Sequence, residues 1–71
     1  MNANQMLKKL EYAEVDSRLA RHPDYRRLLL DERLALKAAA ENGKGLDSAM
    51  RETQRVIAMW SPVVGFDVLA D

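Results

Sequence analysis

Two short interruptions divide a sequence that otherwise favours helix. The first is His22-Pro23, because proline disfavours helical backbone in the residue before it and suits the first turn of a new helix. The second is Gly43-Lys44-Gly45, where Gly43 is placed to adopt the left-handed conformation that commonly ends a helix. A chain punctuated in this way predicts three consecutive helices.

The segments around these interruptions are rich in Leu, Ala, Arg, Glu and Lys, which are good helix formers. We predict helices over about residues 4–21, 23–42 and 46–60, with ends good to roughly two to four residues. Asp47 or Ser48 can cap the third helix. The predicted fold is a small all-α unit in which two long helices meet at a proline corner and a shorter third helix packs back.

The chain changes character after the third predicted helix. Ser61-Pro62 is expected to stop that helix, which places one helical domain at 1–60 and an apolar, extended C-terminal tail at 61–71. The tail side chains expected to dock are Val64, Phe66, Val68 and Leu69. We expect the tail to fold back over its own bundle, because an apolar tail needs a surface to lie on. Docking into a partner as an extended segment is the alternative.

The small size of the chain limits how it can be stabilised. At 71 residues there is room for one domain, which buries a small share of its surface. Small domains often add disulfides, metals or a partner subunit, but this sequence has no cysteine and one histidine, His22. Association remains, and it favours a homodimer, the commonest symmetric assembly, with higher oligomers left open.

Each of the first two predicted helices carries two apolar stripes on opposite sides. The smaller stripes consist of Tyr12, Val15 and Leu19 in the first helix and of Leu30, Leu34 and Ala38 in the second. A three-helix monomer needs one apolar stripe per helix, so the second stripes predict self-association. The alternative is that the third helix and the tail cover both sides within one chain.

Four arginines surround the His22-Pro23 corner. They are Arg18, Arg21, Arg26 and Arg27. Arginine at such a corner can bind phosphate or an acidic surface of a partner. Salt bridges to neighbouring Asp and Glu side chains are the alternative, which we prefer because acidic residues stand beside these arginines in the sequence.

Glu32 interrupts the larger apolar stripe of the second predicted helix. A buried carboxylate is costly unless it is paired, so pairing with an arginine of the first helix or of a second subunit would fix the register between them. We favour the alternative, in which Glu32 lies at the rim of the core and is solvated.

The sequence carries no recognisable catalytic motif. Gly43-Lys44-Gly45 lacks the spaced glycines of a phosphate-binding loop, and His22 has no nucleophile signature with it. Eleven Lys and Arg balance eleven Asp and Glu, which argues against coating DNA or an acidic membrane. We expect a cytoplasmic protein without a signal peptide, membrane segment, metal or cofactor, because the start is polar and cysteine is missing.

These features together favour a non-enzymatic protein-binding module. Such a small adaptor, chaperone or inhibitor would present helix faces to another protein and work as a homodimer. The alternative is a small dimeric nucleic-acid-binding regulator that uses the arginine-rich corner. A purely structural oligomer, in which self-association consumes every apolar stripe, is the third possibility.

Overall fold

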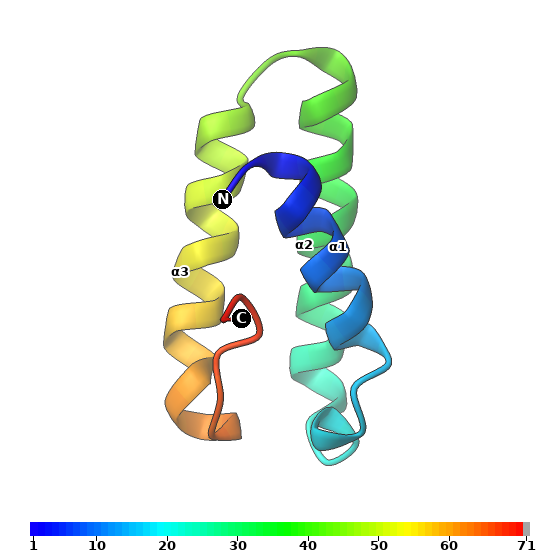
Figure 1. Ribbon diagram of the computed structural model, residues 1–71, viewed down its shortest axis with the longest axis vertical. Helices are drawn as coiled ribbons and strands as arrows, with labels where there is room; N and C mark the ends of the chain where they lie inside the picture. Colours follow the sequence, from blue (N-terminus) through cyan, green and yellow to red (C-terminus); the bar gives the residue numbers. More distant parts are fainter. Residues whose placement is uncertain (71) are drawn as a thin grey trace.

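The computed structural model describes residues 1–70 and is built from helices. In chain order these are α1 (Ala3–Glu14), the short 3-10 helix η1 (Ser17–Leu19), α2 (Pro23–Asn42) and α3 (Leu46–Val64) (Figure 1). The described residues contain three α-helices and no strand, which confirms the predicted all-α class. Asp71, the last residue of the predicted tail, lies outside the described residues.

The bounds of α2 follow directly from the two interruptions. The helix begins at Pro23, as predicted, with Asp24 in its first turn, where the helix dipole favours a negative charge. It ends at Gly43, whose φ of 67° is left-handed and whose N–H donates to the Ala39 carbonyl. Both predicted signals are confirmed.

Helix α1 is shorter than predicted. It begins with a capping box, in which the Asn2 side chain accepts from the Gln5 N–H and the Gln5 side chain accepts from the Asn2 N–H, both at 2.9 Å. It ends at Glu14, so the predicted helix over 4–21 is wrong for its last third. The cause is Asp16, whose carboxylate accepts from the Arg18 N–H at 2.9 Å and starts η1 in place of continued helix.

Helix α3 is longer than predicted, and its start differs too. Pro62 stands inside the last turn, where it removes a single backbone hydrogen bond, and the helix continues to Val64. Gly65 ends it instead, with φ of 88° and its N–H donating to the Ser61 carbonyl at 2.8 Å. The boundary between helix and tail therefore moves from 60 to 64. At the other end Gly45 precedes the helix, and no side-chain cap by Asp47 or Ser48 forms.

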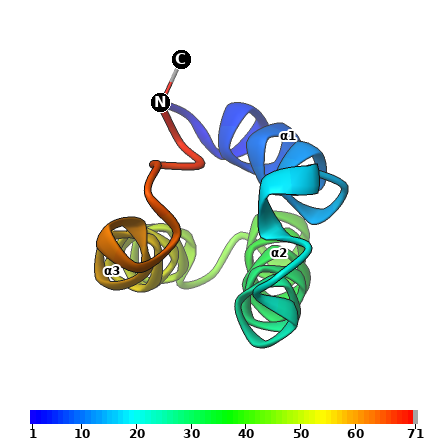
Figure 2. The same cartoon turned by 90° about the horizontal axis from the view of Figure 1, so that it is seen from below.

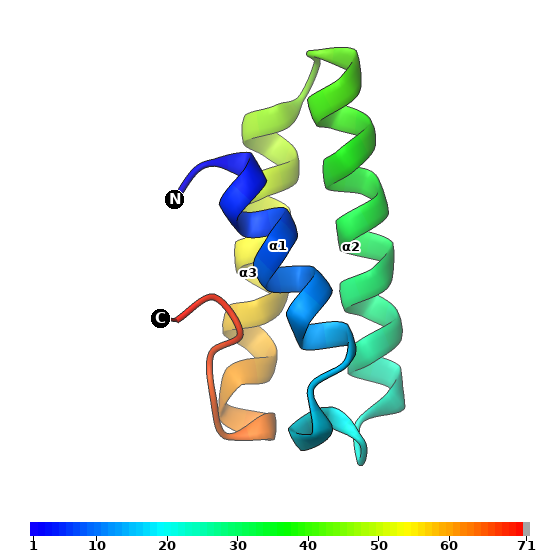
Figure 3. The ribbon, with the colours of Figure 1, turned by 45° about the vertical axis from the view of Figure 1, so that its right-hand side comes forward.

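Helix α2 lies at the corner of the bundle. It packs along both α1 and α3, whereas α1 and α3 touch each other only slightly, so the bundle is open on that side (Figure 2). The core between the helices consists of Met6, Leu10, Ala13, Leu19, Tyr25, Leu29, Leu36, Thr53, Val56, Ile57 and Val68. Val68 belongs to the segment after Gly65, which turns back and lies on the open side between α1 and α3 (Figures 2 and 3).

Candidate functional site

Most of the residues predicted for self-association lie on the surface. Tyr12 is 73% exposed, Val15 77% and Leu34 52%, which are high values for large apolar side chains. Ala38 is also exposed, and Leu30 is half-buried. These side chains are left uncovered by α3 and by the tail, so a single chain does not bury both stripes of α1 and α2.

Leu19 is the exception, because it is fully buried in the core. Its assignment to the outer stripe assumed a helix that continues through residue 21. The chain instead leaves helical geometry after Glu14, and η1 turns Leu19 inward. Leu19 is therefore part of the core of its own chain, which corrects its predicted place in a self-association surface.

The two exposed sets border different depressions. Tyr12 lines a groove of about 200 Å³ between α1, η1 and the tail. Leu30 lines a more open depression of about 370 Å³ together with Glu14, Pro23, Arg26 and Arg27. Apolar side chains in both places stand beside charged groups.

A charge cluster joins the end of α1 to α2. The guanidinium of Arg33 pairs with the Glu14 carboxylate, with Nε and Oε2 2.5 Å apart, and both side chains are largely buried. Arg26 donates to the Glu14 backbone carbonyl from Nη2 at 2.6 Å and from Nε at 3.1 Å. Cations at the carboxyl end of a helix are favoured by its dipole. Sequence reasoning missed Arg33, although the spacing of seven from Arg26 places both on one side of α2.

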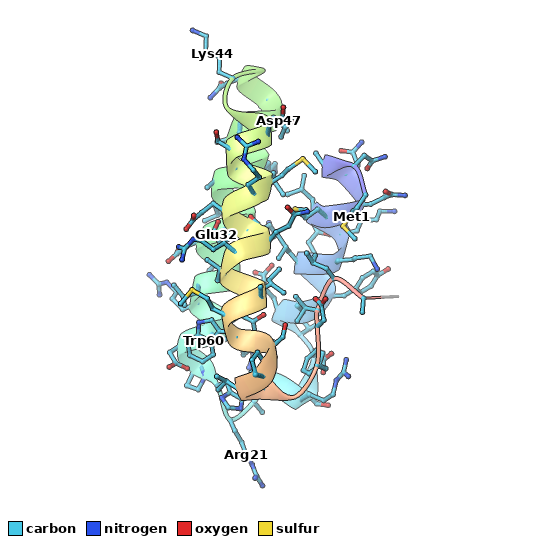
Figure 4. All side chains as sticks on the ribbon, turned by 90° about the vertical axis from the view of Figure 1, so that its left-hand side faces the viewer. Met1, Arg21, Glu32, Lys44, Asp47 and Trp60 are labelled. Carbon is cyan, nitrogen blue, oxygen red and sulfur yellow. The ribbon has the colours of Figure 1, made fainter. Side chains whose placement is uncertain are left out.

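The arginines of the predicted corner mostly have partners within the chain. Arg18 binds Asp16, with Nη2 and Oδ2 2.7 Å apart, and these hydrogen bonds lower the pKa of Asp16. Arg26 is bound to Glu14, as described above, and Arg27 lies 3.7 Å from Asp31 on the exposed side of α2. Arg21 extends away from the end of the bundle (Figure 4).

The residues predicted for tail docking are divided between helix and tail. Val64 is the last residue of α3 and is half-buried against the core. Phe66 lies beneath Arg18, with the guanidinium carbon 3.6 Å from the ring centre, in a cation–π contact. Val68 is buried and Leu69 is half-buried against the core. Lys9 of α1 donates to the Ala70 carbonyl at 3.3 Å.

An aromatic pair that the sequence analysis did not foresee joins α2 to α3. The rings of Tyr25 and Trp60 stack with centroids 4.9 Å apart and planes inclined by 4°. Tyr25 is fully buried, and its hydroxyl has no hydrogen-bond partner among the described residues. Burial raises the pKa of Tyr25 to about 12, and the negative charge of Asp67 on the tail adds to the shift.

Glu32 lies on the face that α2 shares with α3 and is half-buried (Figure 4). The Thr53 hydroxyl of α3 donates to its carboxylate at 3.3 Å. Burial raises the pKa of Glu32, and the Thr53 hydrogen bond opposes that rise. The charge of Glu52 raises it further, and that of Arg55 lowers it. Glu32 is therefore neither fully buried nor merely solvated, and its hydrogen-bond partner is a hydroxyl rather than an arginine.

The last two turns of α3 expose a second apolar surface. Met59 and Val63, four residues apart on one side of the helix, are each 60% exposed. The spacing of these two residues was a signal for this surface that the sequence analysis did not use. It places uncovered apolar groups close to the point where the tail turns back.

Comparison of the chain with protein families, with curated proteins and with solved structures gives no match. Within residues 1–70, no helix is long and apolar enough to cross a bilayer. The same residues contain no group of three or more His, Asp or Glu side chains arranged to hold a metal ion.

Proposed function

We propose that the protein is a non-enzymatic protein-binding module that acts through its helix faces as a homodimer. One observation carries the proposal, which is that Tyr12, Val15 and Leu34 are each more than half exposed. Large apolar side chains left exposed on a small domain are candidates for an interaction surface. We expect such a small adaptor, chaperone or inhibitor to work in the cytoplasm.

The charged groups support binding rather than catalysis. The two carboxylates whose pKa is lowered have structural causes, since Asp16 is bound by Arg18 and Glu52 by Arg55, whose Nη2 lies 2.5 Å from Glu52 Oε1. Each of these pairs lies within one turn of its own segment and fixes local geometry. A perturbed pKa with a structural partner of this kind is weak evidence for a catalytic group.

The homodimer is tested by the solution mass of the wild type and of a Leu30→Glu/Leu34→Glu variant, measured by light scattering. The expected result is a wild-type dimer and a folded monomeric variant. Ala35→Glu/Ala40→Glu is the matched control, because it adds the same charge at exposed positions of α2 outside the stripe and should leave the dimer intact.

Two results would contradict the homodimer or its location on α2. A wild type that stays monomeric up to high concentration removes the homodimer from the proposal. A wild-type dimer that survives the Leu30→Glu/Leu34→Glu change places the contact elsewhere than on the outer stripe of α2. Circular dichroism of each variant separates loss of association from loss of folding.

A nucleic-acid regulator is the second candidate, and the outward course of Arg21 supports it (Figure 4). The in-chain partners of Arg18 and Arg26 reduce the number of guanidinium groups available for phosphate. Binding to duplex DNA that weakens steeply as salt rises, and that Arg21→Ala reduces, would favour this function. Undetectable binding at low salt would end it.

A further inference from the structure

The C-terminal segment and the surface of α1 and η1 on which it lies form a complementary pair, and both line the groove described above. The segment 66–70 occupies the side of the bundle where α1 and α3 touch only slightly (Figures 2 and 3). The contacts that hold it include Phe66 beneath Arg18, Val68 in the core and the Ala70 carbonyl on Lys9.

Charge distinguishes the two halves of this pair. From residue 56 to the end, the sequence contains Asp67 and Asp71 and no Lys, Arg or His. On α1 and η1 the charged residues lining the groove are Lys9, Asp16 and Arg18, and Asp16 holds the Arg18 guanidinium in place over the aromatic ring of the tail. An acidic, aromatic segment is therefore the chemistry that this groove accepts.

A single residue makes the reversal that brings the tail to the groove. Gly65 adopts a φ of 88° directly after α3, and the tail beyond it forms its own turn. In that turn the Ala70 N–H donates to the Asp67 carbonyl at 3.1 Å, and the Leu69 N–H donates to the Asp67 carboxylate at 2.9 Å. A compact segment on a one-residue hinge can leave and dock as a unit.

Docking of the tail on its own chain leaves an apolar surface uncovered next to Gly65. Beside the hinge, Met59 and Val63 remain exposed. If two copies opened at Gly65 and exchanged tails, their hinge regions would adjoin, and these apolar side chains are the surface available to be covered there.

We propose that the groove accepts residues 66–70 of a second copy of this chain, so that two copies exchange tails in a symmetric dimer. The inference rests on the homodimer of the proposed function and names an interface for it. Every copy carries both the acidic aromatic segment and the basic groove, which makes a second copy the partner whose chemistry is already matched.

The test is a complementation experiment with two full-length variants. Val68→Asp places a charge in the apolar part of the tail and leaves the groove residues unchanged. Arg18→Glu reverses a charge in the groove and leaves the tail unchanged. Each variant alone is expected to associate at least tenfold more weakly than the wild type. Their equimolar mixture is expected to form a 1:1 complex, because the groove of the first can take the tail of the second. Analytical ultracentrifugation of differently labelled chains measures this.

Control measurements separate loss of association from loss of folding. Circular dichroism checks that each variant is folded, and the milder pair Phe66→Ala and Arg18→Ala replaces the first pair if either unfolds. Gly65→Ala disfavours the left-handed reversal and is expected to increase the dimer fraction of otherwise wild-type chain. An additional mixture of Val68→Asp with Val68→Asp/Arg18→Glu, which contains no intact tail, is expected to show no complex.

A folded mixture that forms no complex overturns tail exchange. A dimer that persists in both single variants also overturns it. If Leu30→Glu/Leu34→Glu breaks the wild-type dimer while the tail mixture gives no complex, the helix-face proposal stands and tail exchange is wrong. If the mixture associates while the helix-face variant has no effect, tail exchange stands and the helix-face contact is wrong.

Discussion

Tyr25 and Trp60 stack face to face, 4.9 Å between ring centres, and so join the first turn of α2 to the last part of α3. The pair fixes the end of the bundle where the chain also turns into its tail. Tyr25 is fully buried, and its hydroxyl has no hydrogen-bond partner among the described residues. An unpaired buried hydroxyl costs roughly 1–3 kcal/mol, so the stacked pair stabilises this end of the bundle at a local cost.

Removing that hydroxyl should not destabilise the protein. Tyr25→Phe keeps the stacked ring and is expected to leave the free energy of unfolding unchanged or to raise it by up to about 1 kcal/mol. Urea denaturation at pH 7 measures the change. Tyr12→Phe, at an exposed position, is the control and should have no effect. A loss of more than about 1 kcal/mol in Tyr25→Phe would mean that the hydroxyl has a bonding partner in solution.

The raised pKa of Tyr25 predicts how the free energy of unfolding changes at high pH. The pKa of Tyr25 rises from 10.0 to about 12 in the folded chain, so folding favours the protonated phenol. The stability that the protonated phenol of Tyr25 contributes is fully present below pH 10 and is lost as the pH rises from 10 to 12. The total is on the order of 2 kcal/mol. Between pH 9 and 12 the free energy of unfolding should fall more steeply with pH for the wild type than for Tyr25→Phe. Parallel curves would contradict the assignment.

Glu32 should make the protein more stable when it is protonated, since burial raises its pKa in the folded chain. The stability associated with the protonated acid is present at low pH and is lost as the pH rises through the folded pKa. Glu32→Gln, which keeps an oxygen for the Thr53 hydroxyl, is expected to be more stable than the wild type at pH 7 by less than about 1 kcal/mol. The difference should shrink towards pH 3.

Glu52→Gln provides the contrast for this prediction. Its carboxylate lies one turn from Arg55, and the hydrogen bonds from Arg55 lower its pKa. Removing its charge should therefore bring no gain at pH 7. Urea midpoints of both variants at pH 7 and pH 3 decide the matter, and equal gains in the two would refute a special environment for Glu32.

The Glu14–Arg33 pair should couple more strongly than the surface pairs. Both side chains are largely buried, and the guanidinium meets the carboxylate with two nitrogen atoms, Nε and Nη2. A double-mutant cycle with Glu14→Gln and Arg33→Met is expected to give a coupling of about 1–2 kcal/mol. The same cycle on Arg27 and Asp31, 3.7 Å apart and exposed, should give about 0–0.5 kcal/mol. Equal couplings would show that burial adds nothing.

Gly65 should tolerate no side chain without loss of stability in the monomer. Its left-handed backbone is the reason, because a Cβ added there meets no atom within 4 Å. Gly65→Ala is expected to cost about 1 kcal/mol, and Gly65→Asn less, since asparagine accepts this conformation more readily. Thermal unfolding at low protein concentration, where association is absent, provides the comparison. An Ala variant as stable as the Asn variant would argue against a backbone cause.

Local signals predicted the parts of the fold that local chemistry decides. Proline at 23 and glycine at 43 act within one turn of themselves, and α2 has the predicted bounds. The end of α1 needed a comparison between continued helix and the alternative offered by Asp16, which caps η1 while Leu19 enters the core. At the end of α3 the helix continues through Pro62, and Gly65 decides the stop.

The candidate surfaces were predictable to a similar degree. Helical spacing correctly identified Tyr12, Val15 and Leu34 as apolar side chains outside the core stripe, since their exposure depends on one helix at a time. The Tyr25–Trp60 stack and the Glu14–Arg33 pair join different helices, and the spacing of residues along one helix carries no information about such contacts.

The position of α2 between α1 and α3 also has a consequence for the kinetics of folding. Because α2 pairs with the helices just before and just after it, the bundle can assemble from neighbouring segments, which is typical of fast folding. The contact between Lys9 and Ala70 instead closes a loop of 61 residues. We expect it to form last, so that Val68→Ala speeds unfolding in stopped-flow experiments and hardly changes the folding rate. The release of the tail would then be the step that sets the unfolding rate of the folded bundle.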